Sequence, residues 1–468
     1  MKPFLTIGAG LLICSLSFAD SNWMQFRGPN GSGIAAKDQK PPVELSLSKN
    51  LKWKVKVPLG ASSPIVVGER LILTAFEDNQ LWTISYSTKD GKELWRKQAP
   101  VKKIEDFHKS EGSPAASTPV SDGKQIVSYF GSCGLICYDL EGNEKWKYEL
   151  PTAETNNRFG TGTSPTLHDG IVILQRDLAK GSSLYAINLE NGSLIWEKKR
   201  DGFPTSYGSP IIWENQVITT GFMQMKAYDL KSGAEKWTVS NLPSAVCTTP
   251  VVGEDYLFFA GWSPGNEDFP LPTFDELLKE VKDDGEGFIT LKKAQGTFLA
   301  NFFESNDTNG DGKITREEWE ATLNFMKKGR NFAMAIKPGG KGDVTRSHVV
   351  WTKTKGLPYV SSPLLYEGQL FMLKDGGLAS ALEAKTGNEI YLQERIGAGG
   401  SYYSSPVAAN GHIYVASLEG MVSVLKVGPE LNVVAKLKLT EPIKATPAIA
   451  NNTLYIRSTS MLFAFGEK

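Results

Sequence analysis

The segment Pro210-Ile211-Ile212-Trp213-Glu214-Asn215-Gln216-Val217-Ile218-Thr219-Thr220-Gly221 shows the pattern that decides the fold. Two short apolar runs flank a turn at Glu214-Asn215, a third run follows at 225–230, and a fourth at 234–240 carries Trp237. Each run is too short for a core helix, and turn residues such as Asn and Gly separate the runs. The segment therefore predicts a small sheet of four antiparallel strands.

A Ser/Thr-rich stretch ending in proline introduces this unit, and the same signal recurs along the chain. The eight prolines are Pro64, Pro119, Pro165, Pro210, Pro250, Pro363, Pro406 and Pro447. Their spacings are 55, 46, 45, 40, 113, 43 and 41 residues. A period in the forties built of short strands is typical of a β-propeller with one sheet, or blade, per repeat. The sequence predicts an all-β fold, an eight-bladed β-propeller.

The last repeat is one strand short of the others. After Pro447 the chain has three apolar runs, at 448–450, 453–458 and 461–465. The segment Leu51-Lys52-Trp53-Lys54-Val55 precedes the first Ser-Ser-Pro and carries the tryptophan that marks the fourth strand elsewhere. We expect this N-terminal strand to complete the last blade and close the ring.

An aromatic residue recurs near the end of most repeats. Trp95, Trp146, Trp196 and Trp237 each follow the glycine of the last turn by four residues, Tyr391 replaces the tryptophan in one repeat, and Trp351 holds the place in the fifth. Such rings could form a stacking platform for a carbohydrate or a cofactor. Because stacked repeats bury a shared core, we expect instead that each ring packs against the neighbouring blade.

Composition and the N-terminus indicate an exported protein. The 468 residues include 51 basic and 51 acidic side chains, which argues against a nucleic-acid partner. Lys2, an apolar run to Phe18 and the sequence Ser17-Phe18-Ala19 predict a signal peptide over residues 1–19. The run is shorter than the roughly 20 residues that a membrane anchor needs. Cys14 would suit a lipoprotein, but Ile13 precedes it where the lipoprotein signal has a small residue. We expect periplasmic or extracellular export by ordinary cleavage.

Three cysteines remain after cleavage: Cys133, Cys137 and Cys247. Cys133 and Cys137 flank a predicted hairpin turn and its outgoing strand, which makes a disulfide between them doubtful. No Cys-x-x-Cys-His motif for covalently attached haem is present. We expect three unpaired thiols.

The 113-residue gap between Pro250 and Pro363 contains about 68 residues more than an average repeat. Strand-like runs at 256–261, 331–336 and 348–353 place the extra segment, 262–329, between the second and third strands of blade five. Helical spacing recurs in it at 273–281, 291–303 and 316–328. The predicted organisation is a propeller over 20–261 and 330–468, interrupted by a helical module over 262–329.

The module contains Asp307-Thr308-Asn309-Gly310-Asp311-Gly312-Lys313-Ile314-Thr315-Arg316-Glu317-Glu318, which matches the calcium-binding EF-hand loop. Calcium prefers six to eight hard oxygen ligands. The loop offers the side chains of Asp307, Asn309 and Asp311, the carbonyl of Lys313, the hydroxyl of Thr315 directly or through water, and both carboxylate oxygens of Glu318. An acidic surface turn could match by chance, but the helices on both sides favour a calcium site.

A second half of the EF-hand pair precedes this loop. Aligning Ile289 with Ile314 places Lys282 and Lys293 at the first and last ligand positions, where carboxylates are needed. We therefore predict one calcium ion and a structural partner loop. Blade topology puts the module on the face that the Ser/Thr-Pro segments line. With 14 acidic and 8 basic residues it could be a lid, but we favour a stabilising appendage.

Two motifs resemble the tryptophan docking motif of quinoprotein-type propellers: Ala227-x-Asp229-x-x-x-Gly233-x-x-x-Trp237 and Ala186-x-Asn188-x-x-x-Gly192-x-x-x-Trp196. That superfamily includes quinoprotein alcohol dehydrogenases and outer-membrane protein assembly propellers. The segment Asn22-Trp23-Met24-Gln25-Phe26-Arg27-Gly28-Pro29 is similar to the mature N-terminus of exported bacterial propeller proteins with pyrroloquinoline-quinone-like (PQQ-like) repeats. The resemblance implies the fold, and it implies a cofactor funnel in the dehydrogenase branch.

Two functions stay open. A PQQ-dependent dehydrogenase needs a bound quinone, a metal and a catalytic carboxylate. The adjacent cysteine pair of the quinoprotein alcohol dehydrogenases is absent here, and none of His108, His168, His348 and His412 lies in a recognisable nucleophile motif. The other function is a scaffold that binds a protein, peptide or envelope component. Its candidate loops carry aromatic residues and arginine: Asn157-Arg158-Phe159, Thr205-Ser206-Tyr207, Leu357-Pro358-Tyr359 and Ser401-Tyr402-Tyr403. We favour the scaffold, with calcium as cofactor and no catalytic residue assigned.

Overall fold

The computed structural model describes residues 22–467 apart from 109–110, 156–158, 205 and 267–269. The predicted signal peptide, including Cys14, lies outside the described residues, as do Asn157, Arg158 and Thr205 of the candidate loops. No helix in the described part of the chain is long and apolar enough to cross a membrane.

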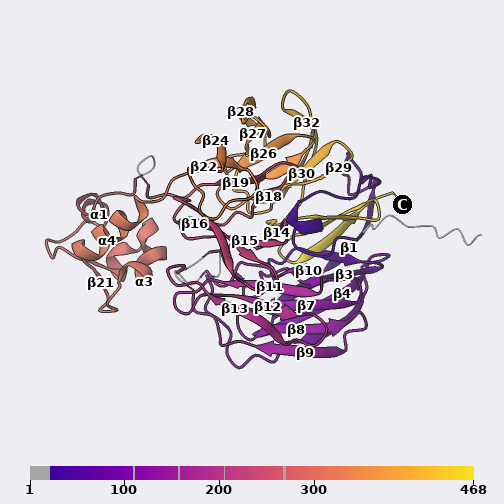
Figure 1. Cartoon of the computed structure of the whole chain (residues 1–468), viewed down its shortest axis with the longest axis horizontal. Helices are drawn as coiled ribbons and strands as arrows, with labels where there is room; N and C mark the ends of the chain where they lie inside the picture. Colours follow the sequence, from indigo (N-terminus) through magenta and orange to yellow (C-terminus); the bar gives the residue numbers. More distant parts are fainter. Residues whose placement is uncertain (1–21, 109–110, 156–158, 205, 267–269, 468) are drawn as a thin grey trace, which may run out of the picture.

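Eight antiparallel sheets form the propeller and confirm the predicted blade count (Figure 1). Blades one and two are β2 (Ile65–Val67), β3 (Arg70–Glu77), β4 (Gln80–Ser87) and β5 (Glu93–Gln98), then β6 (Val120–Ser121), β7 (Gln125–Phe130), β8 (Gly134–Asp139) and β9 (Glu144–Glu149). Blades three and four are β10 (Thr166–His168), β11 (Ile171–Arg176), β12 (Ser183–Asn188) and β13 (Leu194–Lys199), then β14 (Ile211–Trp213), β15 (Gln216–Gly221), β16 (Gln224–Asp229) and β17 (Glu235–Ser240).

The second half of the ring contains one interrupted blade. Blades five and six are β18 (Val251–Val252), β19 (Leu257–Gly261), β22 (Phe332–Ile336) and β24 (Val349–Lys353), then β25 (Leu364–Tyr366), β26 (Gln369–Lys374), β27 (Leu378–Glu383) and β28 (Glu389–Arg395). Blade seven is β29 (Val407–Ala409), β30 (His412–Ala416), β31 (Met421–Lys426) and β32 (Asn432–Lys438). A short strand, β23 (Gly342–Asp343), adds to blade four parallel to β17.

The ring is closed by the N-terminal strand. Blade eight combines β33 (Ala448–Ala450), β34 (Thr453–Arg457) and β35 (Met461–Phe465) with β1 (Leu51–Lys56), whose Trp53 lies opposite Ala464. Figure 1 accordingly shows indigo and yellow strands side by side at the closure. Strands far apart in the chain are thereby joined in one sheet.

Burial explains the strand sequences. The first strand of a blade is short and buried on both faces, as β14 is along its whole length, so it reads as a continuous apolar run. The fourth strand is at the outer edge, and β32 alternates between exposed and partly buried residues. The predicted apolar and alternating runs thus correspond to inner and outer strands.

The recurring tryptophans pack between blades, as expected. The indole Nε1 atoms of Trp53, Trp95, Trp146, Trp196 and Trp351 each donate a hydrogen bond of 2.7–3.0 Å to a carbonyl of the following blade. A Cβ on Gly192 would lie 2.7 Å from the ring of Trp146, which explains why glycine occupies that turn. Trp237 differs, since its Nε1 donates to Gln216 within its own blade.

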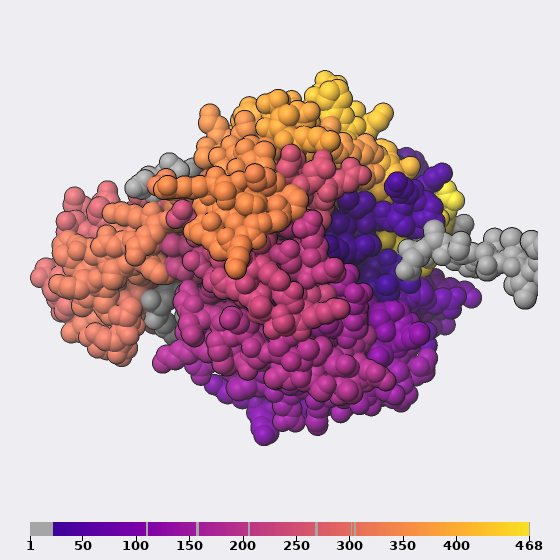
Figure 2. Space-filling view, viewed as in Figure 1, coloured from indigo at the N-terminus to yellow at the C-terminus, as the bar shows by residue number. Residues whose placement is uncertain are grey.

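A helical module lies between β19 and β22. It contains α1 (Phe274–Glu280), β20 (Ile289–Thr290), α2 (Leu291–Ala294), η3 (Phe298–Phe302), α3 (Phe303–Asn306), β21 (Lys313–Ile314) and α4 (Arg316–Met326). Its small core includes Leu277, Ile289, Ile314 and Trp319. Figures 1 and 2 show it as a lobe to one side of the propeller.

The expectation of one helix over 291–303 is wrong. The chain breaks after α2 because Gly296 has a positive φ of 85°, a conformation that glycine adopts at low cost. Thr297 then caps η3 by accepting a hydrogen bond from the backbone N–H of Leu299. The break turns the following residues, including Phe302, towards the propeller.

Candidate functional site

A closed ring of hydroxyl groups surrounds the propeller axis. Its members are the residues that precede the eight prolines: Ser63, Thr118, Ser164, Ser209, Thr249, Ser362, Ser405 and Thr446. The backbone N–H of each donates a 3.0 Å hydrogen bond to the side-chain hydroxyl of the next, and Thr446 donates back to Ser63. We call this the hydroxyl ring. Sequence reasoning used the prolines for counting and missed the role of the residue before each.

A central cavity of about 380 Å³ opens onto the hydroxyl ring. Its walls include the rings of Phe159, Tyr207, Tyr359 and Tyr403. One of these aromatic residues comes from each of the four loops that the sequence singled out. The structure therefore brings the described parts of all four loops together, and one aromatic side chain from each lines the cavity.

Few charged groups reach this cavity. Glu111 accepts a hydrogen bond from the hydroxyl of Tyr403 through its carboxylate, and from Lys444 Nζ through its carbonyl oxygen at 3.4 Å. Burial lowers the pKa of Lys444 and raises the pKa of the Cys247 thiol to about 12. Cys247 is thus protonated at neutral pH and is a poor nucleophile. The three described cysteines are unpaired, as expected.

Glu105 is a buried carboxyl group behind the cavity wall. It accepts hydrogen bonds from the backbone N–H of Thr161, at 3.2 Å, and from the Thr161 hydroxyl, at 3.0 Å. Burial raises the pKa of Glu105 to about 7, although these hydrogen bonds oppose the shift. Nothing in the sequence around Glu105 indicated this environment.

Glu105 is expected to make stability depend on pH. Between about pH 4.5 and pH 7 the folded protein keeps a proton that the unfolded chain has lost. The free energy of unfolding should therefore fall by about 2–3 kcal/mol as pH rises through this window. Urea unfolding at pH 5 and pH 8 measures this fall. Glu105→Gln should abolish this fall in stability, whereas Glu44→Gln, at an exposed carboxyl group, should not. If Glu105→Gln showed the same fall as the wild type, Glu105 would not be the group responsible.

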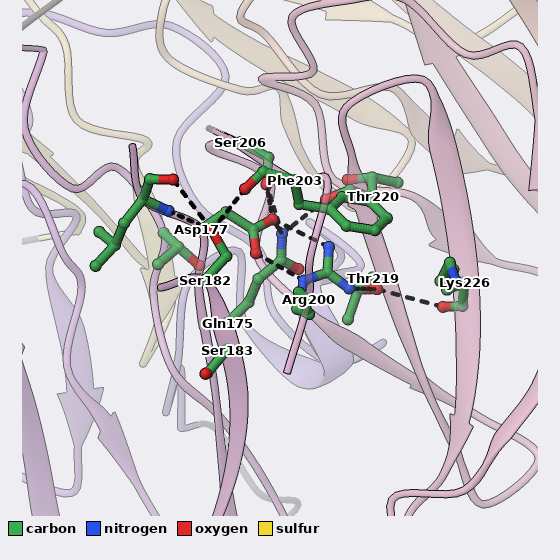
Figure 3. Close-up of polar contacts among 12 residues, drawn as sticks. Gln175, Asp177, Ser182, Ser183, Arg200, Phe203, Ser206, Thr219, Thr220 and Lys226 are labelled. Carbon is green, nitrogen blue, oxygen red and sulfur yellow. Dashed lines mark hydrogen bonds and ion pairs between the residues drawn. The ribbon is translucent and has the colours of Figure 1, made fainter. Parts of the chain in front are cut away.

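A buried ion pair positions the loop that carries Tyr207 (Figure 3). The Asp177 carboxylate accepts hydrogen bonds from Arg200 Nε at 2.6 Å and from Arg200 Nη2 at 3.0 Å, and both side chains are fully buried. Asp177 Oδ2 also accepts hydrogen bonds from Ser206 Oγ and Gln175 Nε2. Arg200 Nη1 donates to Thr219 Oγ1 at 2.9 Å. Because Ser206 immediately precedes Tyr207, the network fixes one wall of the cavity.

The fold and the repeats agree with known proteins. A family model described as outer membrane protein assembly factor BamB matches residues 45–166 and 113–267. These matches and the eight blades identify the repeat type. The chain is a β-propeller of PQQ-like repeats. No curated protein sequence matches it significantly.

Solved structures share the fold of this PQQ-like propeller at low sequence identity. BamB from Moraxella catarrhalis is 13% identical with a TM-score of 0.54, covering 89% of this chain and 96% of that one. Quinohemoprotein alcohol dehydrogenase from Comamonas testosteroni is 9% identical with a TM-score of 0.58, covering 96% and 81%. A europium-containing methanol dehydrogenase is 9% identical with a TM-score of 0.57, covering 95% and 98%.

The helical module of the PQQ-like propeller reaches the cavity. Phe302 lines the cavity, and its ring lies 6.2 Å from that of Phe159 in an edge-on arrangement. On α4, the Phe325 ring stacks on Phe222 of blade four at 4.3 Å. Residues before and after the acidic loop, 307–318, therefore contact the propeller. The module therefore supplies part of the cavity wall.

The acidic loop is folded around its own side-chain oxygens. Asp307 Oδ2 accepts a hydrogen bond from the backbone N–H of Gly312 at 2.9 Å, and Asn309 Oδ1 accepts one from Asp311 at 2.8 Å. Glu318 Oε2 accepts one from the N–H of Thr315 at 2.9 Å, which forms a capping box at the start of α4. Within the described residues, no group of three or more His, Cys, Asp and Glu side chains is placed to hold a metal ion.

The partner loop holds a lysine among its carboxylates. β20 and β21 pair with Ile289 opposite Ile314, the register used for the sequence alignment. Lys293 Nζ lies 2.9 Å from Asp283, 2.6 Å from Asp284 and 3.0 Å from Glu286. Asp283 also accepts hydrogen bonds from the N–H groups of Gly285 and Gly287. An ammonium group thus provides the positive charge in this half of the module.

Proposed function

We propose that the protein is an exported, calcium-binding propeller that binds a protein or peptide of the cell envelope in its central cavity. The observation that carries the proposal is the aromatic wall, to which four propeller loops and the helical module contribute. Aromatic side chains in concave sites are typical anchors for a partner. The BamB-like repeats support a protein partner, and the apolar segment of residues 1–19 supports export.

Calcium is proposed at the loop 307–318 of an EF-hand module that spans residues 262–329. Asp307, Asn309, Asp311, Lys313, Thr315 and Glu318 would supply oxygen ligands. The donor set is all oxygen, as calcium requires, and glycine at 312 has the positive φ, 83°, of the sharp turn. The bound ion would neutralise the carboxylates of Asp307, Asp311 and Glu318. Because the Lys293 ammonium already neutralises the carboxylates of the partner loop, we propose one calcium ion and not two.

A PQQ-dependent dehydrogenase is the second candidate. The fold similarity to a quinohemoprotein alcohol dehydrogenase and a methanol dehydrogenase favours it. The cavity lies on the propeller axis and has aromatic walls that would accept a planar ring system. In this case the same aromatic residues would hold the quinone, and calcium could bind with it.

A dye-reduction assay distinguishes the scaffold from the dehydrogenase. The purified protein, supplied with pyrroloquinoline quinone, calcium and an alcohol, is expected to reduce no dye above the level of the heat-inactivated protein. Robust alcohol-dependent turnover would replace the scaffold with the dehydrogenase.

Site-specific photo-crosslinking tests the partner directly. A photoreactive residue at Tyr403 in the cavity should yield a defined adduct with an envelope protein, and Tyr359→Ala should weaken the interaction at least about tenfold. The same probe at Leu194, which is 45% exposed on the outer strand β13, is the control and should give no such adduct. Equal adducts at both positions would contradict binding in the cavity.

A further inference from the structure

The segment 22–36 crosses the ring and contacts several blades. The carbonyl of Met24 accepts a hydrogen bond from Ser121 of blade two, and Asn30 exchanges two hydrogen bonds with Ile212 of blade four. Ala35 donates to Ala408 of blade seven. Phe26 of the same segment lines the central cavity. The segment therefore spans one end of the propeller axis and reaches the cavity floor.

Arg27, the next residue, is fully buried and poorly partnered. Its Nη2 donates to the carbonyl of Pro363 at 2.6 Å and to that of Ser32 at 3.5 Å. Its Nε and Nη1 atoms have no hydrogen-bond acceptor among the described residues. Burial lowers the pKa of Arg27 to about 9, which still leaves the guanidinium charged at neutral pH.

The other fully buried arginines show what is unusual about Arg27. Arg200 is paired with the Asp177 carboxylate. Arg457 donates to four oxygen atoms, on Pro58, Ser62 and Thr74. A buried charge without an opposite charge or a full set of hydrogen bonds is strongly destabilising. Arg457 leaves only its Nε without an acceptor among the described residues, whereas Arg27 leaves both Nε and Nη1. Of the three arginines, Arg27 is thus the least compensated, which indicates a missing partner.

The hydroxyl ring, whose Ser362 precedes the residue that Arg27 contacts, has unused donors. Each of its eight oxygens accepts a backbone N–H, and none of the eight hydroxyls donates to another group in the described part of the chain. A hydroxyl that accepts one hydrogen bond is a better donor in a second. Pro363, which Arg27 contacts, directly follows Ser362 of the ring. A Cβ on Gly33 would lie 3.2 Å from Arg27 Nη2 and 3.0 Å from the carbonyl of Pro406, which follows Ser405.

We propose that a small monovalent anion binds on the propeller axis, between the Arg27 guanidinium and the hydroxyl ring. The guanidinium supplies the charge and planar N–H donors, and the ring supplies neutral O–H donors, which together suit chloride or a carboxylate. The anion is either free in solution or the carboxylate of a ligand in the cavity. This site is separate from the proposed calcium loop, and the binding of a free anion to it does not depend on the identity of the cavity's partner.

Thermal unfolding of the mature protein in three sodium salts tests the site. At constant ionic strength, chloride or acetate at 100 mM should raise Tm by roughly 2–4 °C over bulky gluconate. A response to chloride alone indicates a free inorganic ion, and a response to acetate shows that a carboxylate fits. Arg27→Met should remove the response, whereas Arg346→Met, at an exposed arginine, should keep it.

Crystals of the wild-type protein soaked in sodium bromide make the test independent of whether Arg27→Met folds. An anomalous peak within hydrogen-bond distance of Arg27 Nε or Nη1 is expected. Equal Tm values in the three salts, or bromide peaks confined to the molecular surface, would overturn the proposal.

Discussion

Asp177→Ala is expected to lower the free energy of unfolding by about 3–5 kcal/mol. The substitution removes the only carboxylate that pairs with the buried Arg200 in the described structure, at 2.6 Å. The guanidinium would then lie uncompensated between blades three and four, and Ser206 Oγ and Gln175 Nε2 would lose an acceptor. Urea unfolding followed by tryptophan fluorescence measures the loss.

Asp229→Asn is the matched control for Asp177→Ala. Asp229 forms an ion pair with Lys236 at 3.2 Å, but its side chain is 31% exposed. Exposed pairs contribute about 0–1 kcal/mol, and asparagine can keep the turn hydrogen bonds to Ser232. A loss in Asp177→Ala no larger than that in the control would show that the buried ion pair stabilises the fold no more than an exposed pair does. The position of the loop that carries Tyr207 could then not be attributed to this ion pair.

Calcium is expected to raise the melting temperature of the chelator-treated protein. The physical reason is that the carboxylates of Asp307, Asp311 and Glu318 repel one another until a cation neutralises them. Calcium at a hundredfold excess over Kd would stabilise the folded state by about 2.7 kcal/mol. Differential scanning calorimetry with calcium and with chelator measures the shift, and Asp307→Ala combined with Glu318→Ala should abolish it.

Glu317→Ala combined with Glu320→Ala is the control for the calcium prediction. Like the test variant it removes two carboxylates, here both from α4, but neither residue is among the proposed ligands. This variant should keep the full calcium shift. Identical melting curves with calcium and chelator in the wild type, or loss of the shift in the control, would contradict the assigned loop.

The sequence predicted the blades because each blade repeats one local pattern. Proline after Ser or Thr, a buried first strand and a docking tryptophan recur in register, so their spacing revealed ring closure and the place of the module. The pairing of Ile289 with Ile314 was also visible, since it follows from aligning two similar loops. Apart from the closure itself, which pairs β1 with β35, these features depend on residues close together in the chain.

The cavity depends on contacts that local patterns do not encode. Phe302 reaches the propeller because the chain breaks at Gly296, which the helical spacing of 291–303 concealed. Asp177 and Arg200 meet across two strands, and Arg27 contacts Pro363 at a separation of 336 residues. The first pairing is determined by the strand order of blade three, and the second by the closed ring as a whole. The Lys293 ammonium was predicted to exclude calcium, but its contacts with three carboxylates were not foreseen.

The central claim is that this PQQ-like propeller is a calcium-binding scaffold with a partner in its cavity. Native mass spectrometry of the protein purified from the cells that produce it tests the metal, the cofactor and the partner together. We predict one calcium ion per chain, a bound protein or peptide and no quinone. A chain that carries pyrroloquinoline quinone, or that carries neither calcium nor a partner, would contradict the account.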